Sequence, residues 1–134
     1  MSPDVVKRKI SQIDTYLTEL IEISRECGEE LRDRDRYAAE RMMLLLIETA
    51  SDLLAHTLKD KFKVKTRSYY EVFAEAAKKS LIDEKLKNIL ADLSGFRNML
   101  VHQYVDINPE TVFDNIDVFI GAFSEFMRQV KEWA

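Results

Sequence analysis

Hydrophobic positions recur every three or four residues along most of the chain, and short polar runs separate these periodic segments. This spacing is typical of amphipathic α-helices, because residues three and four apart share one helix face. Ser2 and Pro3 form a typical helix start, since a hydroxyl can cap the first turn and proline suits its first position. Gly28 is a suitable end. We predict a first helix between them, with an apolar face formed by Val6, Ile10, Ile13, Leu17 and Leu20.

A second helix is predicted from Asp33 or Asp35 to about Leu58. Its centre, Met42–Ile47, is apolar on every side, and a helix of this kind is buried on every side. Two arrangements fit this pattern. The helix packs against its own bundle on one face and against another subunit on the other, or it is the central helix of a bundle with no partner.

Two further helices follow in the sequence. Ser68 and Glu71 form a capping-box pattern that opens a shorter third helix, which ends near Lys79. Asp83 can cap a fourth helix. Gly95 lies inside that helix, where glycine costs about 1 kcal/mol relative to alanine. We therefore expect another backbone to approach closely there, such as the symmetry-related helix of a dimer.

Asn108 and Pro109 start the fifth helix in the same way as Ser2 and Pro3 start the first. An apolar stripe with helical spacing follows and is rich in aromatic side chains. We interpret this stripe as core rather than as a cofactor-binding surface. Its members are Val112, Ile116, Phe119, Phe123, Phe126, Val130 and Trp133.

The whole pattern predicts an all-α protein. The 134 residues include only three glycines and two prolines, which leaves little material for the turns of an all-β fold. No segment has the character of a strand, an internal repeat or a low-complexity tract. We predict one domain over residues 1–134, an antiparallel bundle of four long helices plus one short helix.

The fourth helix runs into a segment, Phe96–Tyr104, in which Arg97, Asn98, His102 and Tyr104 interrupt an apolar run. Burying these polar groups unpaired would cost several kcal/mol, so they need an explanation. Asn98 and His102 lie one turn apart on one face, whereas Arg97 and His102 lie about 140° apart around an ideal helix. Either the helix end is distorted, or a second copy of the segment completes the site in a homodimer.

These residue types suit phosphodiester chemistry. His102 can take or return a proton near neutral pH, and the guanidinium of Arg97 matches a phosphate. The Asn98 amide can orient a neighbour. The set contains no cluster of carboxylates for a metal, which favours transfer without a metal ion, and no cofactor is predicted. The alternatives are an ordinary ion pair for Arg97 and a helix cap or packed polar group for His102.

The net charge is −4, so any RNA-binding surface must be a local patch. Basic residues are concentrated in the segment Lys59–Arg67. The candidate RNA contacts within it are Lys61, Lys63, Lys65 and Arg67. A solvated loop is an equally weighted alternative.

Other features of the sequence bear on location. Cys27 is the only cysteine, which excludes an internal disulfide and a cysteine-based zinc cluster. No run approaches the roughly 18 apolar residues that span a bilayer, and the first residues lack an apolar signal region. We predict a cytoplasmic protein with no membrane partner.

The pattern Arg97-Asn98-x-x-x-His102-x-Tyr104 resembles the Arg-x4-His-x-Tyr signature of the HEPN superfamily. It is most similar to the HepT toxins of type VII toxin–antitoxin pairs. The likeness includes the helix Arg36–His56 and the Ser-Tyr-x-Glu start at Ser68, together with the Asp-Ile-x-x-x-x-Val-Phe run after Tyr104. One departure is Ser80, where glycine is expected between the third and fourth helices.

The resemblance implies a HEPN-like fold and a toxin that is a metal-independent endoribonuclease, with Arg97 and His102 at a homodimer interface. It also implies a cognate MNT-type nucleotidyltransferase antitoxin, which attaches AMP to Tyr104 and so blocks substrate entry. RNA is then the substrate, and no DNA partner is predicted. The alternatives are a non-catalytic nucleotide- or substrate-binding subunit of a minimal nucleotidyltransferase and a plain helical scaffold. Tyr104 could instead stack on RNA bases or pack at the dimer seam.

Overall fold

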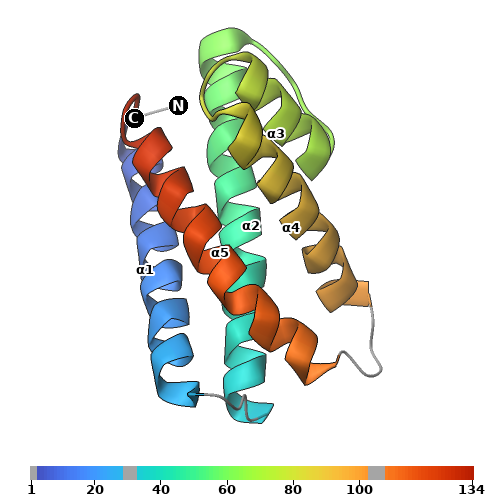
Figure 1. Cartoon of the computed structure of the whole chain (residues 1–134). Helices are drawn as coiled ribbons and strands as arrows, with labels where there is room; N and C mark the ends of the chain where they lie inside the picture. Colours follow the sequence, from blue (N-terminus) through green and yellow to red (C-terminus); the bar gives the residue numbers. More distant parts are fainter. Residues whose placement is uncertain (1–2, 29–32, 103–107) are drawn as a thin grey trace.

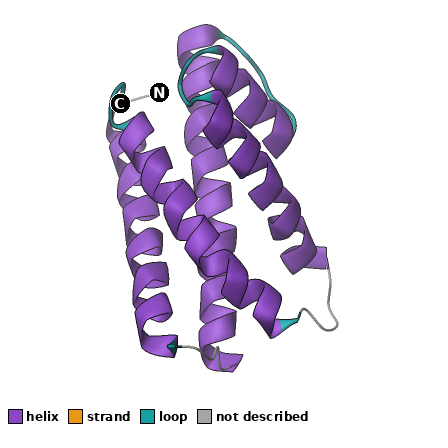
Figure 2. Ribbon diagram, in the orientation of Figure 1, coloured by secondary structure: helices purple, strands orange, loops and turns teal. Residues whose placement is uncertain are grey.

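The computed structural model describes residues 3–28, 33–102 and 108–134. These residues form five helices and no strand (Figure 2). The helices are α1 (Pro3–Cys27), α2 (Asp33–Phe62), α3 (Tyr69–Lys78), α4 (Glu84–His102) and α5 (Pro109–Val130). The prediction of an all-α bundle with four long helices and one short helix is therefore confirmed.

α2 is the central helix of the bundle, because it contacts each of the other four. Figure 1 shows α1 antiparallel to α2, α5 crossing in front of both, and α4 beside α2 with α3 packed across their upper parts. Met43, Leu46 and Ile47 on α2 are fully buried within the chain, whereas Leu44 and Leu45 are half-buried. The central-helix arrangement thus accounts for most of the apolar run without a partner.

Polar side chains cap α3, α4 and α5 where the sequence predicts, whereas Ser2, the predicted cap of the first helix, lies outside the described residues. The Ser68 hydroxyl accepts a hydrogen bond from the Glu71 backbone N–H at 3.1 Å. Asp83 Oδ1 accepts from the Leu86 N–H at 2.8 Å. Asn108 caps α5 in the same way. Each cap satisfies a backbone donor that the first turn of a helix leaves unpaired.

Two boundaries carry unusual backbone conformations. α2 continues to Phe62, beyond the predicted end at Leu58, so the basic segment begins as the last helical turn rather than as a loop. Lys63 follows with a φ of 57°. Ser80, between α3 and α4, has a φ of 60°, which explains why glycine is expected at that position.

The aromatic stripe of α5 is core, as predicted. Phe119, Phe123 and Phe126 are fully buried, and consecutive ring centroids lie 6.0 and 5.9 Å apart. Phe96 on α4 continues this stack, with its ring centroid 5.9 Å from that of Phe119. Phe96 is half-buried, and this contact packs the residue just before Arg97 against the core.

Gly95 has a neighbour within its own chain. A Cβ atom at this position would lie 3.5 Å from the Tyr70 hydroxyl, so the group that approaches this glycine is a side chain of α3. Within the described residues, no helix is both long enough and apolar enough to cross a membrane.

Candidate functional site

Arg97 points from α4 toward the centre of α2. Its Nη2 donates a hydrogen bond to Glu48 Oε1 at 2.9 Å, and the two side chains are 18% and 37% exposed. The ion pair is therefore partly shielded from water, which strengthens the attraction relative to a surface pair.

Two more side chains fix the guanidinium of Arg97. Its Nη1 donates to Asn98 Oδ1 at 3.3 Å. Its Cζ lies 5.2 Å from the centroid of the Tyr69 ring, which is the geometry of a cation–π contact. Nε is buried and has no acceptor among the described residues. The cation is thus held by α2, α3 and α4 together; we call Arg97, Glu48, Tyr69 and Asn98 the Arg97 cluster.

Burial in this cluster shifts the ionisation of the phenol. Desolvation raises the pKa of Tyr69, and the negative charges of Glu48 and Asp52 raise it further, while the charge of Arg97 opposes the shift. Burial dominates, because removing an ionised phenol from water is costly. Tyr69 is therefore neutral at physiological pH and presents an intact aromatic face to the cation.

A pocket of about 360 Å³ opens beside the Arg97 cluster, between α2, the loop at residues 63–68 and α3. A second pocket, of about 290 Å³, adjoins it and shares Ala55 and Thr66. We call the two together the α2–α3 groove. The first pocket is lined by residues that include Ser51, Thr66, Arg67, Tyr69, Tyr70 and Asn98.

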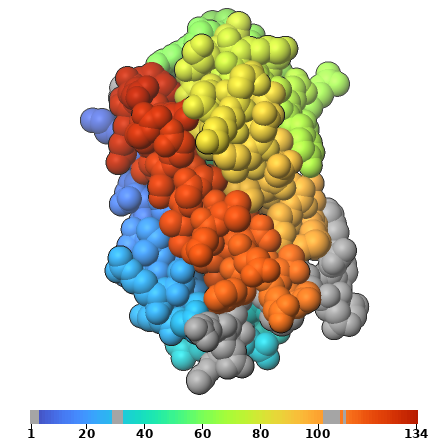
Figure 3. Space-filling model, in the orientation of Figure 1, coloured from blue at the N-terminus to red at the C-terminus, as the bar shows by residue number. Residues whose placement is uncertain are grey.

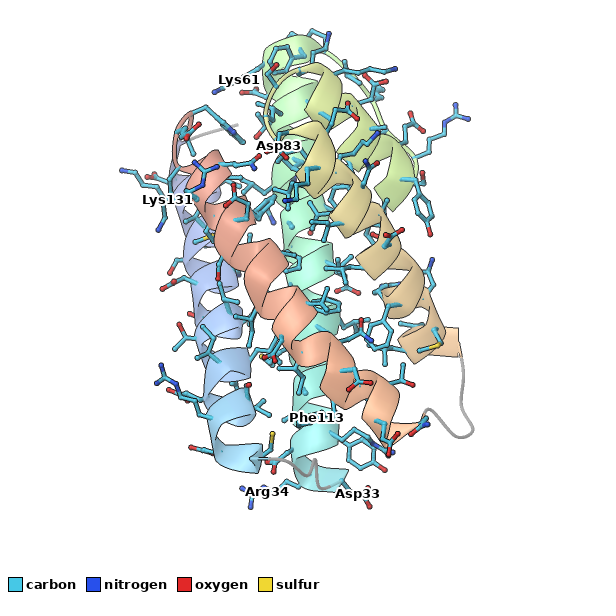
Figure 4. All side chains as sticks on the ribbon, viewed as in Figure 1. Asp33, Arg34, Lys61, Asp83, Phe113 and Lys131 are labelled. Atoms are coloured by element: carbon cyan, nitrogen blue, oxygen red, sulfur yellow. The ribbon has the colours of Figure 1, made fainter. Side chains whose placement is uncertain are left out.

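The four basic residues predicted to contact RNA do not lie together. Lys65 and Arg67 line the α2–α3 groove. Lys61 lies at the end of α2, where its Nζ is 5.4 Å from the Trp133 ring, near the chain's C-terminus (Figure 4). Lys63 Nζ donates to the Asp60 carbonyl at 3.1 Å. Of these four residues, only Lys65 and Arg67 thus line the groove that Asn98 also lines.

The other half of the predicted motif is described only in part. α4 is α-helical from Arg97 through His102, so positions 97 and 102 keep their separation of about 140° around the helix. The His102 side chain lies outside the described residues, and so does the whole of Tyr104.

A larger pocket lies elsewhere, between the first turns of α4 and the middle of α5, and has a volume of about 610 Å³. Figure 3 shows these two helices side by side on the face toward the viewer. The pocket is lined by Leu86, Ile89 and Val118 among others, and none of the motif residues borders it. Within the described part of the chain, no group of three or more His, Cys, Asp or Glu side chains is placed to hold a metal ion.

Sequence reasoning missed Glu48 and Tyr69. Glu48 is the only charged residue in the stretch 42–51 of α2, and an acid in an apolar run is a signal for a buried partner. In the sequence, Tyr69 belongs only to the Ser-Tyr-x-Glu pattern that starts at Ser68. Its contact with Arg97 depends on how α3 packs against α4, which local sequence patterns do not determine.

Comparison with known proteins places the chain in a family. The sequence profile described as "Ribonuclease HepT-like" matches residues 13–130. The chain is 26% identical over 135 residues to a tRNA nuclease HepT of Aphanizomenon flos-aquae, covering 99% of this chain and 92% of the relative. It is 28% identical over 90 residues to a putative RNase of Archaeoglobus fulgidus, covering 67% of each.

A solved structure shares the fold. It is the tri-AMPylated HEPN toxin of Shewanella oneidensis in complex with an MNT antitoxin. The two chains superpose with a TM-score of 0.87 at 20% sequence identity, over 98% of this chain and 99% of that one. The predicted HEPN-like fold and the predicted membership of a ribonuclease family are confirmed. The chain belongs to the ribonuclease HepT-like family.

Proposed function

We propose that this protein is the toxin of a HEPN/MNT toxin–antitoxin pair, a cytoplasmic endoribonuclease that is a single HEPN domain over residues 1–134. The observation that carries the proposal is the Arg97 cluster. A guanidinium from the motif is fixed by Glu48 and Tyr69 beside a pocket of about 360 Å³ that Asn98 lines. A positioned cation beside a nucleotide-sized pocket suits the binding of a phosphodiester.

The proposed reaction is attack by a ribose 2′-hydroxyl on the adjacent phosphorus. His102 of one protomer accepts the 2′-hydroxyl proton as the new 2′-O–P bond forms. The P–O5′ bond breaks, and a protonated histidine returns a proton to the leaving 5′-oxygen. The products are a 2′,3′-cyclic phosphate and a 5′-hydroxyl, with no metal or cofactor consumed. Arg97 stabilises the charge that gathers on the phosphoryl oxygens.

The mechanism requires two protomers. Positions 97 and 102 face about 140° apart on a regular helix, so one α4 does not aim both side chains at one atom. A homodimer that pairs two α4 helices supplies two arginines and two histidines to a shared cleft. One histidine then acts as base and the other as acid.

The proposed partner is an MNT-type nucleotidyltransferase that transfers AMP to Tyr104. The Shewanella oneidensis toxin with this fold is AMPylated and bound to an MNT antitoxin. An anionic nucleotide two residues from His102 would compete with RNA phosphate for Arg97. Incubation with the cognate antitoxin and ATP is expected to add AMP to the parent protein and not to Tyr104→Phe. Equal labelling of the variant would show that the modified residue is not Tyr104.

The decisive experiment for the nuclease is RNA cleavage by the purified protein in the presence of EDTA. We expect cleavage to persist with chelator, to disappear in Arg97→Ala and His102→Ala, and to remain in Arg128→Ala. Arg128 is an exposed control on α5 that pairs with Glu125. Thermal melting should be unchanged in His102→Ala. Cleavage that survives both motif substitutions would contradict the proposal.

A second candidate function is a non-catalytic subunit that presents a nucleotide or substrate to the nucleotidyltransferase. It is favoured by the net charge of −4 and by an Arg97 that is 18% exposed and already paired with Glu48. Calorimetric titration with ATP, alone and with the antitoxin, distinguishes the two functions. Tight nucleotide binding without RNA cleavage supports this second function.

A further inference from the structure

The α2–α3 groove is a cationic channel in an acidic protein. Lys59, Lys65 and Arg67 border it, and all three are exposed. Within the described residues, none of them forms an ion pair. The acid on its wall, Asp52, faces Lys9 at 3.8 Å, which offsets its charge. The charged side chains that line the groove are therefore predominantly basic, which suits a chain of phosphates.

An aromatic ring stands at the end of the groove nearest the motif. Tyr70 is 51% exposed, although large aromatic side chains are usually buried. Its hydroxyl lies 3.5 Å from the position that a Cβ atom at residue 95 would take, an ordinary contact distance, so the ring packs beside Gly95 on the motif helix. Asn98 lines the same pocket. The arrangement offers an open π-face next to the site of the proposed reaction.

The floor of the groove is made of small side chains. Ser51 and Ala55 on α2 and Thr66 on the loop leave two adjoining pockets of about 360 and 290 Å³. Pockets of this size admit single nucleotides, whereas a duplex needs a broad surface that contacts its backbone over many base pairs. Exposed aromatic rings alternating with cations are typical of proteins that bind single strands.

We propose that the α2–α3 groove binds the unpaired RNA segment next to the cleaved bond, with one base stacked on Tyr70 and successive phosphates on Arg67 and Lys65. The inference rests on the proposed nuclease function and names the form of its substrate at that site. Lys61 and Lys63, which the sequence predicts as RNA contacts, are not expected to contact the RNA in this groove. Lys61 faces Trp133, and Lys63 donates a hydrogen bond to the Asp60 carbonyl.

The test is fluorescence anisotropy with a 5′-fluorescein-labelled single-stranded RNA of about 10 nucleotides. The protein is the full chain carrying His102→Ala, so that the probe is not cut. We expect Tyr70→Ala to weaken binding about tenfold, as loss of one stacked base does. We expect Arg67→Gln to weaken binding and to lower the slope of log affinity against log salt by about one.

Matched controls lie at the other end of α2. Tyr37 is an exposed aromatic residue, 59% accessible, and Arg34 is an exposed cation near the start of that helix (Figure 4). Tyr37→Ala and Arg34→Gln are expected to bind the probe within about twofold of the parent, because neither residue borders the groove. Lys61→Gln is expected to behave like these controls.

Two results would overturn the inference. One is unchanged binding by both Tyr70→Ala and Arg67→Gln, and the other is equal affinity for the probe and for its fully paired duplex. Cleavage by the wild-type protein is measured in parallel. If cleavage occurs while the groove variants bind normally, only the groove assignment fails; if the groove binds RNA but no cleavage occurs, only the nuclease function fails.

Discussion

Arg97 Nη2 and Glu48 Oε1 lie 2.9 Å apart and join the motif helix α4 to the central helix α2. The two residues are 49 positions apart in the sequence, so the contact exists only in the folded bundle. It fixes the direction of the guanidinium before any substrate arrives. A preorganised cation needs no reorganisation when negative charge develops on a phosphoryl group.

Glu48→Ala is expected to lower the free energy of unfolding by about 1–3 kcal/mol, because it removes the carboxylate that pairs with a shielded guanidinium. Glu48→Gln keeps an acceptor oxygen and is expected to lose less. Urea denaturation measures both. The matched control is Glu132→Ala, which removes an exposed partner of Arg128 and is expected to cost no more than about 0.5 kcal/mol.

The same variants test the role of Glu48 in the reaction. If it positions Arg97, Glu48→Ala lowers kcat for RNA cleavage more than it changes KM, and Glu48→Gln recovers part of the loss. A Glu48→Ala protein that is destabilised yet cuts RNA at the parent rate would show that the ion pair is structural only.

Tyr69 is expected to ionise at a higher pH than the ordinary value of about 10, because burial raises the pKa of its phenol. Ultraviolet difference absorbance between the parent and Tyr69→Phe isolates its titration. The folded state holds this proton more tightly than the unfolded state. The contribution of the protonated Tyr69 phenol to the free energy of unfolding is therefore complete below about pH 10, and it is lost as the pH rises through the folded pKa.

Arg97→Ala tests the direction in which the charge of Arg97 shifts the pKa of Tyr69. The charge of Arg97 opposes the shift, so removing it is expected to move the Tyr69 midpoint still higher. A midpoint that falls in Arg97→Ala would mean that the ring and the guanidinium are not neighbours.

Ser80→Gly is expected to stabilise the protein by about 1 kcal/mol, because residue 80 has a φ of 60° that favours glycine. Thermal unfolding measures the effect. Ser124→Gly is the control within α5, where glycine is expected to destabilise by about 0.5–1 kcal/mol. Destabilisation by both substitutions would contradict the left-handed conformation at Ser80.

Local signals were enough to predict the helices. Ser68, Asp83 and Asn108 each cap a helix at the predicted residue, since capping depends on atoms only two or three positions away. The end of α2 was predicted too early. There the Val64 N–H donates to the Leu58 carbonyl, and this closing contact has no distinct sequence signature.

The site was predictable only in part. The motif indicates Arg97 and Asn98 directly, and in the structure their side chains form a hydrogen bond of 3.3 Å. Glu48 and Tyr69 come from other helices, so their positions depend on packing rather than on spacing along the chain. The basic segment is predicted to be an RNA-contact patch or a solvated loop, yet its residues divide because α2 continues into it and Lys61 lies against Trp133.

The most direct test of the central claim uses a heterodimer with one wild-type protomer and one His102→Ala protomer, purified through two different tags. If one histidine acts as base and the partner's as acid, losing either costs about 10²–10⁴-fold. We therefore predict RNA cleavage at or below about 1% of the wild-type rate. About half the wild-type rate would mean that each protomer cuts alone, and it would contradict a site shared between two copies of α4.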